Sequence, residues 1–193
     1  MPRAGLSHLP NLITLTRLAL VPVLILLLKD GEYATGLVVF VLAGISDALD
    51  GYLAKRLNVQ SRLGAILDPV ADKLLLVSAY VMLTVLGHIP FWLMLVVAFR
   101  DLLIVVGYVI YTSHAGPVKM RPSFLSKLNT FAQIALVGLI LAEQATSRDW
   151  PQIVEGMWFV VLATTVISGA HYLWLWMIEK DIEPASKGEK PLD

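Results

Sequence analysis

Residues 33–86 read YATGLVVFVLAGISDALDGYLAKRLNVQSRLGAILDPVADKLLLVSAYVMLTVL. Two apolar runs, Tyr33–Ala54 and Asp72–Leu86, are joined by a short polar segment, which predicts two helices that form an antiparallel hairpin. Four aspartates lie where these runs approach the polar segment: Asp47, Asp50, Asp68 and Asp72. Apolar helices that keep four carboxylates near one end predict a polar site at that end of the hairpin.

The composition indicates that this hairpin belongs to a membrane protein. Of the 193 residues, 57% are hydrophobic and only 16% are charged, whereas a soluble domain carries roughly 25% charged residues. Apolar runs of about 17–25 residues are typical of membrane helices. Six such runs are predicted, at about Asn11–Leu28, Tyr33–Ala54, Asp72–Leu86, Pro90–Tyr111, Ser126–Ala142 and Ile153–Ile178.

The predicted fold class is therefore an all-α integral membrane protein, a bundle of six transmembrane helices. We expect a single membrane-embedded domain over residues 1–193, with a short N-terminal segment at 1–10 and a polar C-terminal tail at 179–193. Fifteen basic residues balance fifteen acidic ones, so the chain has no global positive field that would bind nucleic acid. The absence of cysteine excludes disulfides, thiolate metal sites and a cysteine nucleophile.

Basic residues are distributed unequally between the two predicted ends of the helices. One end collects most of them: Arg3, Arg17, Lys55, Arg56, Arg62, Lys73, Lys119, Arg121, Lys127, Lys180, Lys187 and Lys190. The opposite end has only Lys29 and Arg148, and Arg100 lies within a predicted span. Because basic residues accumulate on the cytoplasmic side, we expect both termini and the aspartates there, at the plasma membrane if the cell is bacterial.

The spacing of the four aspartates predicts that they form one site. Asp47 and Asp50 are three residues apart, and Asp68 and Asp72 are four apart, so each pair shares a helix face. An ionised aspartate at the centre of a membrane helix costs about 2.5–3.5 kcal/mol, so the cluster needs compensating positive charge. Carboxylate oxygens suit hard cations, and two Mg²⁺ or Mn²⁺ ions would balance four aspartates.

Basic side chains flank these aspartates and can hold phosphate oxygens: Lys55, Arg56, Arg62 and Lys73. Paired divalent ions promote displacement at phosphorus, so the residues alone predict metal-assisted phosphoryl or phosphodiester transfer at the cytoplasmic membrane face. Two other interpretations stay open at this point. The aspartates can serve as turn and helix-start residues, or the cluster can bind the cargo of a cation transporter.

From Asp47 to Asp72 the sequence closely resembles the signature of the CDP-alcohol phosphatidyltransferases, D-x2-D-G-x2-A-R-x8-G-x3-D-x3-D. Seven of its eight fixed positions match, and the departure is Lys55 where the family usually has arginine. The resemblance implies a six-helix membrane fold that transfers a phosphatidyl group from CDP-diacylglycerol to an alcohol, in phospholipid biosynthesis, with release of CMP. Family members are often dimers, so a homodimer is expected.

The same resemblance implies roles for individual residues. Asp47, Asp50 and Asp68 match the metal ligands of the family, and Asp72 matches the proposed general base, which is sometimes also assigned to a metal. Further positions match those that line the CDP moiety: Gly51, Ala54, Lys55 and Gly64, with Arg56 as an alternative phosphate ligand beside Lys55.

The acceptor alcohol is predicted from a second region. Residues 10–17 (PNLITLTR) resemble the opening of the glycerol-lipid branch of the family, and residues 122–133 (PSFLSKLNTFAQ) resemble cardiolipin synthases of the eukaryotic type. This favours phosphatidylglycerol as acceptor, with glycerol 3-phosphate, the substrate of phosphatidylglycerophosphate synthases, as the alternative. Candidates for holding the acceptor's phosphate are Lys127, Arg121 and Arg100, although Arg100 can equally form an internal pair with Asp101.

Overall fold

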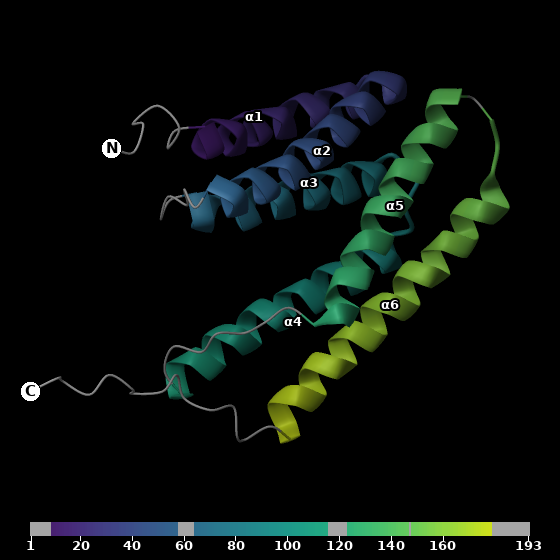
Figure 1. Cartoon of the computed structure of the whole chain (residues 1–193). Helices are drawn as coiled ribbons and strands as arrows, with labels where there is room; N and C mark the ends of the chain where they lie inside the picture. Colours follow the sequence, from purple (N-terminus) through teal and green to yellow (C-terminus); the bar gives the residue numbers. More distant parts are fainter. Residues whose placement is uncertain (1–8, 58–63, 116–122, 147, 179–193) are drawn as a thin grey trace, which may run out of the picture. The chain divides into compact units, whose positions relative to one another are not determined.

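The computed structural model describes residues 9–57, 64–115, 123–146 and 148–178. Within these ranges the regular structure is entirely helical (Figure 1). Six helices follow one another along the chain: α1 (Leu9–Lys29), α2 (Tyr33–Leu57), α3 (Gly64–Val85), α4 (Phe91–Ala115), α5 (Phe124–Thr146) and α6 (Pro151–Ile178). The predicted tail at 179–193 and most of the predicted N-terminal segment lie outside the described residues.

Each predicted apolar run corresponds to one observed helix. Eleven of the twelve boundaries agree to within four residues, and the exception is the start of α3. This helix begins at Gly64, eight residues before the predicted start at Asp72, so Asp68 and Asp72 lie inside the helix and do not open it. Pro69 is the sixth residue of this helix, so it removes one intrahelical hydrogen bond, and the remaining bonds of the 22-residue helix are kept.

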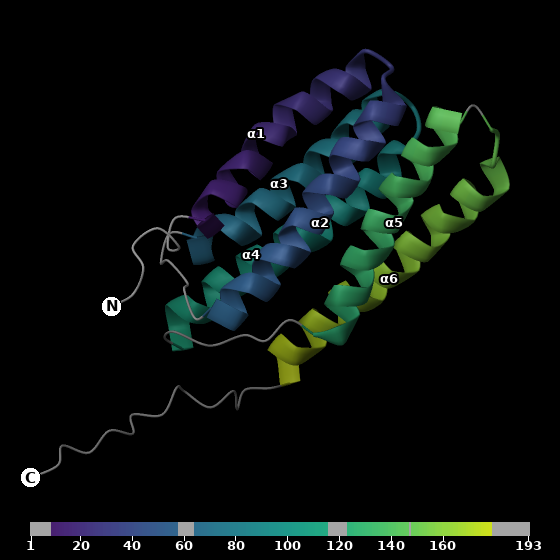
Figure 2. The same ribbon diagram turned by 45° about the horizontal axis from the view of Figure 1, so that its top comes forward.

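The chain divides into two compact units. Unit 1 comprises residues 1–91 and 134–155, and unit 2 comprises residues 92–133 and 156–193. In unit 1, α1 packs against both α2 and α3, and Figures 1 and 2 show these three helices side by side. Gly36 lets α2 approach α1 closely, because a Cβ atom there would lie 3.3 Å from Leu28 Cδ2.

Two tight connections end the helices of unit 1. Gly31 follows α1 with a φ of +78°, and Gly87 follows α3 with a φ of +84°, a backbone conformation that glycine adopts without steric cost. The Tyr33 hydroxyl and His88 Nε2 share a hydrogen bond of 3.0 Å, so the connections after α1 and α3 meet at one end of this unit. Burial lowers the pKa of His88, and the Glu143 carboxylate raises it in part.

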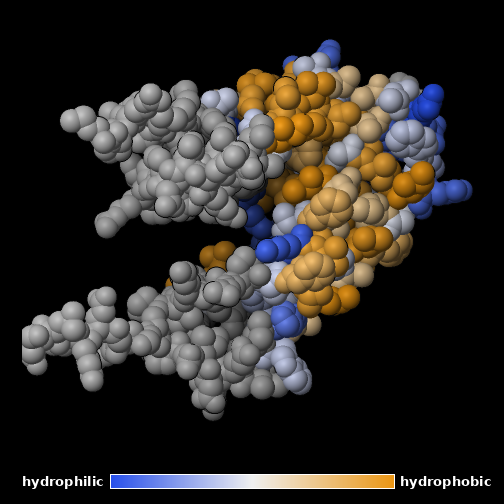
Figure 3. Space-filling model, viewed as in Figure 1, coloured by the Kyte–Doolittle hydropathy of each residue, from blue (hydrophilic) through white to orange (hydrophobic). Residues whose placement is uncertain are grey.

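Among the described residues, apolar side chains lie both in the interior and on the outside of the helices. Large apolar side chains are exposed on every helix, for example Leu26, Val38, Leu95, Phe131 and Phe159, and Figure 3 shows that hydrophobic residues cover much of the visible described surface. The mainly apolar interior also holds six polar or charged side chains: Arg17, Arg100, Asn129, Gln133, Thr165 and Ser168. Exposed apolar surface of this extent marks contact with a membrane or a partner.

Two of the described helices are long and apolar enough to cross a membrane, over Phe124–Thr146 and Pro151–Trp174. Shorter apolar stretches occur at Tyr33–Ser46 and Lys73–Val85. The all-helical architecture is thus confirmed for the described residues. The interpretation of all six helices as spans stays a prediction.

Candidate functional site

The signature residues lie on two consecutive helices. Asp47, Asp50, Gly51, Ala54, Lys55 and Arg56 belong to α2, and Gly64, Asp68 and Asp72 belong to α3. Because both stretches are helical, residues three or four apart lie on one helix face, as the sequence argument assumed. Both helices pack against α1.

The sequence predicts that the four aspartate carboxylates lie close together, and the structure does not describe their side chains. The side chains of residues 47–72, and all of residues 58–63 with Arg62, lie outside the described part of the chain. Among the side chains that are described, no group of three or more histidine, aspartate or glutamate residues could hold a metal ion. The metal and CDP-binding roles of the signature residues therefore stay predictions.

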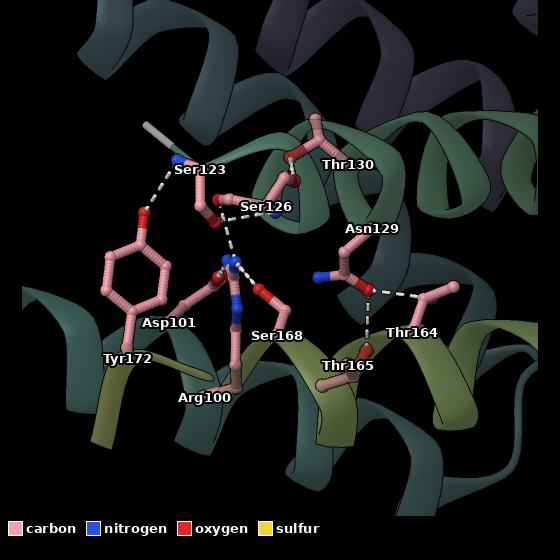
Figure 4. A network of polar contacts seen from close by, with 10 residues as sticks. All are labelled: Arg100, Asp101, Ser123, Ser126, Asn129, Thr130, Thr164, Thr165, Ser168 and Tyr172. Atoms are coloured by element: carbon pink, nitrogen blue, oxygen red, sulfur yellow. Dashed lines mark hydrogen bonds and ion pairs between the residues drawn. The ribbon is translucent and has the colours of Figure 1, made fainter. Parts of the chain in front are cut away.

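A second group of polar side chains lies inside unit 2, where α4, the first half of α5 and α6 meet (Figure 4). Arg100 of α4 is at its centre. Its Nη1 donates to Asp101 Oδ1 at 3.0 Å, and its Nη2 donates to Ser126 Oγ of α5 at 2.8 Å and to Ser168 Oγ of α6. One guanidinium thus connects three helices, and the internal Arg100–Asp101 ion pair that the sequence suggested is present.

The start of α5 is held against this arginine. Ser123 directly precedes the helix, and its Oγ accepts a hydrogen bond of 3.2 Å from the Ser126 amide, which is the usual N-cap arrangement. The Tyr172 hydroxyl of α6 accepts a bond of 3.5 Å from the Ser123 amide, and the Arg100 guanidinium carbon lies 5.9 Å from the Tyr172 ring centroid. The cap and the arginine together fix where α5 begins.

Asn129 forms a second connection between α5 and α6. Its Oδ1 accepts hydrogen bonds from Thr164 Oγ1 at 3.0 Å and from Thr165 Oγ1 at 2.8 Å. Gln133 lies one helical turn further along α5 and is also buried. Polar side chains thus continue along one face of α5 from Ser126 through Asn129 to Gln133.

The three acceptor-phosphate candidates have different surroundings. Arg100 is buried, whereas Lys127 is exposed. Arg121 lies outside the described residues. A role for any of the three in binding the acceptor stays a prediction.

Sequence reasoning missed the contribution of α6. Thr165, Ser168 and Tyr172 all contact the polar group of unit 2, and Thr164 contacts it beside them. A signal was present, because residues 165, 168 and 172 are spaced three and four apart, which places them on one face of an otherwise apolar helix. Small polar residues at helical spacing in an apolar run predict an interior face.

The helical architecture and the signature on α2 and α3 identify the class of protein. A family model described as CDP-alcohol phosphatidyltransferase matches residues 7–177, which is most of the chain. The chain therefore belongs to the CDP-alcohol phosphatidyltransferase family, and this confirms the resemblance found in the sequence.

Individual relatives carry two kinds of name. A "Probable cardiolipin synthase (CMP-forming)" of Drosophila melanogaster is 34% identical over 188 residues, which cover 89% of this chain and 58% of the relative. A "CDP-diacylglycerol--glycerol-3-phosphate 3-phosphatidyltransferase" of Bacillus subtilis is 31% identical over 182 residues, covering 86% and 93%. A "Cardiolipin synthase (CMP-forming)" of Streptomyces coelicolor is 37% identical over 139 residues, covering 69% and 64%.

The lengths of these relatives differ from that of the matched region. The chain spans 58–60% of the length of the cardiolipin synthases of Drosophila melanogaster, Rattus norvegicus and Homo sapiens that it matches. It spans 93% of the Bacillus subtilis relative. The matched region therefore corresponds to part of the animal proteins and to nearly all of the bacterial one.

Proposed function

We propose that the protein transfers a phosphatidyl group from CDP-diacylglycerol to an alcohol, with release of CMP, in a metal-dependent reaction. The observation that carries this proposal is the near-complete family signature, from Asp47 to Asp72, on two consecutive helices of a chain that belongs to the family. The relatives named as cardiolipin synthases and as a glycerol-3-phosphate phosphatidyltransferase support the same reaction class.

The donor set of α2 and α3 fits two divalent cations. Asp47, Asp50, Asp68 and Asp72 offer only carboxylate oxygens, and such ligands suit Mg²⁺ or Mn²⁺. Bound there, the cations would neutralise the negative charge that develops on the pyrophosphate and on departing CMP. The aspartates thereby bind and place the reacting end of CDP-diacylglycerol.

The residues of the chain would then carry the transfer itself. Asp72 accepts the proton of the acceptor hydroxyl, because an alcohol is a weak nucleophile until a positioned base removes its proton. The alcohol oxygen forms a bond to the phosphorus that bears the diacylglycerol, and the bond from that phosphorus to the CMP oxygen breaks. Gly51, Ala54, Lys55 or Arg56, and Gly64 hold the CDP moiety.

The proposed acceptor is phosphatidylglycerol, which would make the product cardiolipin. The similarity of residues 122–133 to cardiolipin synthases of the eukaryotic type supports this choice, as do the relatives of that name. Glycerol 3-phosphate is the alternative, and the Bacillus subtilis relative supports it. Lys127, Arg121 and Arg100 are the proposed ligands of the acceptor's phosphate.

We also propose that all six helices cross the membrane in one domain, with the four aspartates and both termini on the cytoplasmic side. The exposed apolar side chains and the unequal distribution of basic residues support this arrangement. An active site at that face lets lipid and soluble substrates meet. We also propose a homodimer in the bilayer, because members of the family are often dimers.

The direct test compares acceptors with purified protein in lipid micelles. CMP release is measured with CDP-diacylglycerol, Mg²⁺ or Mn²⁺, and either phosphatidylglycerol or glycerol 3-phosphate, with serine and inositol as further arms. We expect release with phosphatidylglycerol, and its loss on chelation of the metal. If no acceptor elicits CMP release, the proposed activity is wrong. Ion flux in proteoliposomes without any nucleotide would instead support a cation transporter.

A further inference from the structure

Trp158 Nε1 of α6 is a buried donor that no described residue accepts, and three further such donors of unit 2 belong to side chains that are themselves buried. They are Arg100 Nε, Asn129 Nδ2 and Gln133 Nε2. These side chains are 6%, 0% and 2% exposed, so bulk water does not reach them in this structure. A buried donor without an acceptor is costly, and three of them in one polar group indicate that an acceptor from outside the chain belongs there.

The hydrogen bonds of Asn129 fix which atom of its amide faces this group. Thr165 Oγ1 donates to Asn129 Oδ1 at 2.8 Å, so the oxygen is directed toward the threonines of α6. The amide nitrogen is then directed the other way, and Figure 4 shows it on the side of Ser168 and Arg100. No group among the described residues accepts a hydrogen bond from this nitrogen.

Gln133 extends the same row of donors. It follows Asn129 by four residues on α5, so both amides lie on one face of that helix. Ser126 lies three residues before Asn129 and accepts a hydrogen bond from Arg100 at 2.8 Å. The unused donors of Arg100, Asn129 and Gln133 therefore belong to one face of α5 and the arginine that contacts it.

The chemistry of these donors limits the ligand. All three unused atoms are N–H donors, which excludes a metal cation and favours a ligand rich in oxygen acceptors. The charge of Arg100 is already matched by Asp101, and the two amides are neutral, so no large excess of negative charge is required. Phosphate oxygens and hydroxyl oxygens of a small polar headgroup meet these conditions.

We infer that Asn129 and Gln133, together with Arg100 Nε, bind and orient the glycerol-phosphate headgroup of the acceptor alcohol. This inference rests on the proposed function and adds two uncharged residues to the basic candidates named for the acceptor. Phosphatidylglycerol and glycerol 3-phosphate share this headgroup chemistry. The amide donors hold the glycerol-phosphate group in one position and orientation.

The test uses Gln133→Leu in the full-length protein, with Gln152→Leu as matched control. Gln152 is an exposed residue at the start of α6, so the same change there removes an amide outside the polar group. We expect Gln133→Leu to raise the KM for the acceptor about tenfold, as loss of a hydrogen bond to an anionic group does. The KM for CDP-diacylglycerol should change less than about twofold in the same assay.

Thermal unfolding separates a binding role from a structural one. Leucine removes an unsatisfied buried donor, so the unfolding temperature of Gln133→Leu should stay the same or rise. A fall in both stability and the affinity for CDP-diacylglycerol would make Gln133 a packing residue and overturn the inference. An unchanged KM for the acceptor would also overturn the inference, because the unused N–H groups would then bind only a buried water.

A binding measurement keeps this test independent of catalysis. Micelles containing phosphatidylglycerol, or glycerol 3-phosphate in solution, should raise the unfolding temperature of the wild type and of Gln152→Leu more than that of Gln133→Leu at the same concentration. Asn129→Asp, which retains the oxygen acceptor for Thr165 and loses the N–H donors, should behave like Gln133→Leu. If no acceptor elicits CMP but this pattern holds, the proposed function fails and the headgroup site stands. Equal shifts in every variant would refute the site.

Discussion

Arg100 shows, at the scale of single residues, how a charge is accommodated inside an apolar protein. Its guanidinium donates to Asp101, Ser126 and Ser168, and lies near the ring of Tyr172. A buried arginine without such partners would be strongly unfavourable. The planar group with several donors reaches three helices at once, which a lysine ammonium at the same position cannot do.

The first prediction concerns this connection. Arg100→Lys keeps the charge but loses the geometry that joins Asp101 with the two serines, so we expect unfolding to become easier by about 1–3 kcal/mol. Thermal or denaturant unfolding in micelles measures this. Arg148→Lys, at an exposed position, is the matched control and should change little. Equal stability of the two variants would show that the connections contribute nothing.

The second prediction at this scale concerns the general base. Asp72→Asn has nearly the same shape and cannot accept the hydroxyl proton, so CMP release should fall about 10²–10⁴-fold. The rate of CMP release under saturating substrates measures the effect. Asp149→Asn, at an exposed position, should keep normal activity. A fully active Asp72→Asn protein would remove the general-base assignment.

The residue scale also shows what the sequence could predict of the site. The spacing of Asp47, Asp50, Asp68 and Asp72 is sufficient to place each pair on a helix face, because helical geometry depends on local spacing alone. Two hydrogen bonds were not predicted: the one that Thr165 donates to Asn129 of α5, and the one that Ser168 accepts from Arg100 of α4. They depend on which faces of distant helices meet, and a short hydroxyl side chain in an apolar run carries little information about its partner.

At the scale of elements, apolar runs predicted the six helices well because each run is long and ends at turn-forming residues. The error at α3 lies in the predicted start at Asp72, whereas the helix continues back through Pro69 to Gly64. A proline near a helix start costs one hydrogen bond, which the rest of a 22-residue helix tolerates. Local signals therefore located this element but not its first turn.

A third prediction concerns two glycine-to-alanine substitutions. One should destabilise the protein and the other should stabilise it, because the first glycine lies in a turn and the second inside a helix. Gly87→Ala, at a φ of +84° after α3, should destabilise the protein by about 1 kcal/mol. Gly156→Ala lies inside α6, where an added Cβ meets no atom within 4 Å, and should stabilise it by about 0.5–1 kcal/mol. Unfolding of both variants beside the wild type checks the pair. The same sign for both would contradict the described backbone.

The connection between α3 and α4 gives a fourth prediction, on pH. Burial lowers the pKa of His88 below its usual 6.5, so the folded protein binds this proton less readily than the unfolded chain. The contribution of neutral His88 is therefore present above pH 6.5 and is lost as the pH falls below it. The His88→Gln variant has no titrating group at this position. Its unfolding temperature should therefore fall less than that of the wild type between about pH 8 and pH 5. Parallel losses would contradict the shifted pKa.

At the scale of the whole molecule, the chain has few charged residues, and they lie in separate groups. The aspartates of the signature lie on α2 and α3, Arg100 and Asp101 pair inside unit 2, and apolar side chains cover much of the outside. Family membership connects this arrangement to lipid chemistry. In the proposed reaction, α2 and α3 bind the nucleotide end of the donor, and the polar group of unit 2 binds the acceptor.

The central claim is that the protein joins a phosphatidyl group to an alcohol and does not merely hydrolyse CDP-diacylglycerol. The most direct measurement quantifies CMP and the lipid products together, by mass spectrometry, after purified protein meets CDP-diacylglycerol, phosphatidylglycerol and Mg²⁺ or Mn²⁺. The account predicts CMP and cardiolipin in equal amounts, and neither product after chelation of the metal. Formation of CMP with phosphatidic acid and no acceptor-derived lipid would contradict it.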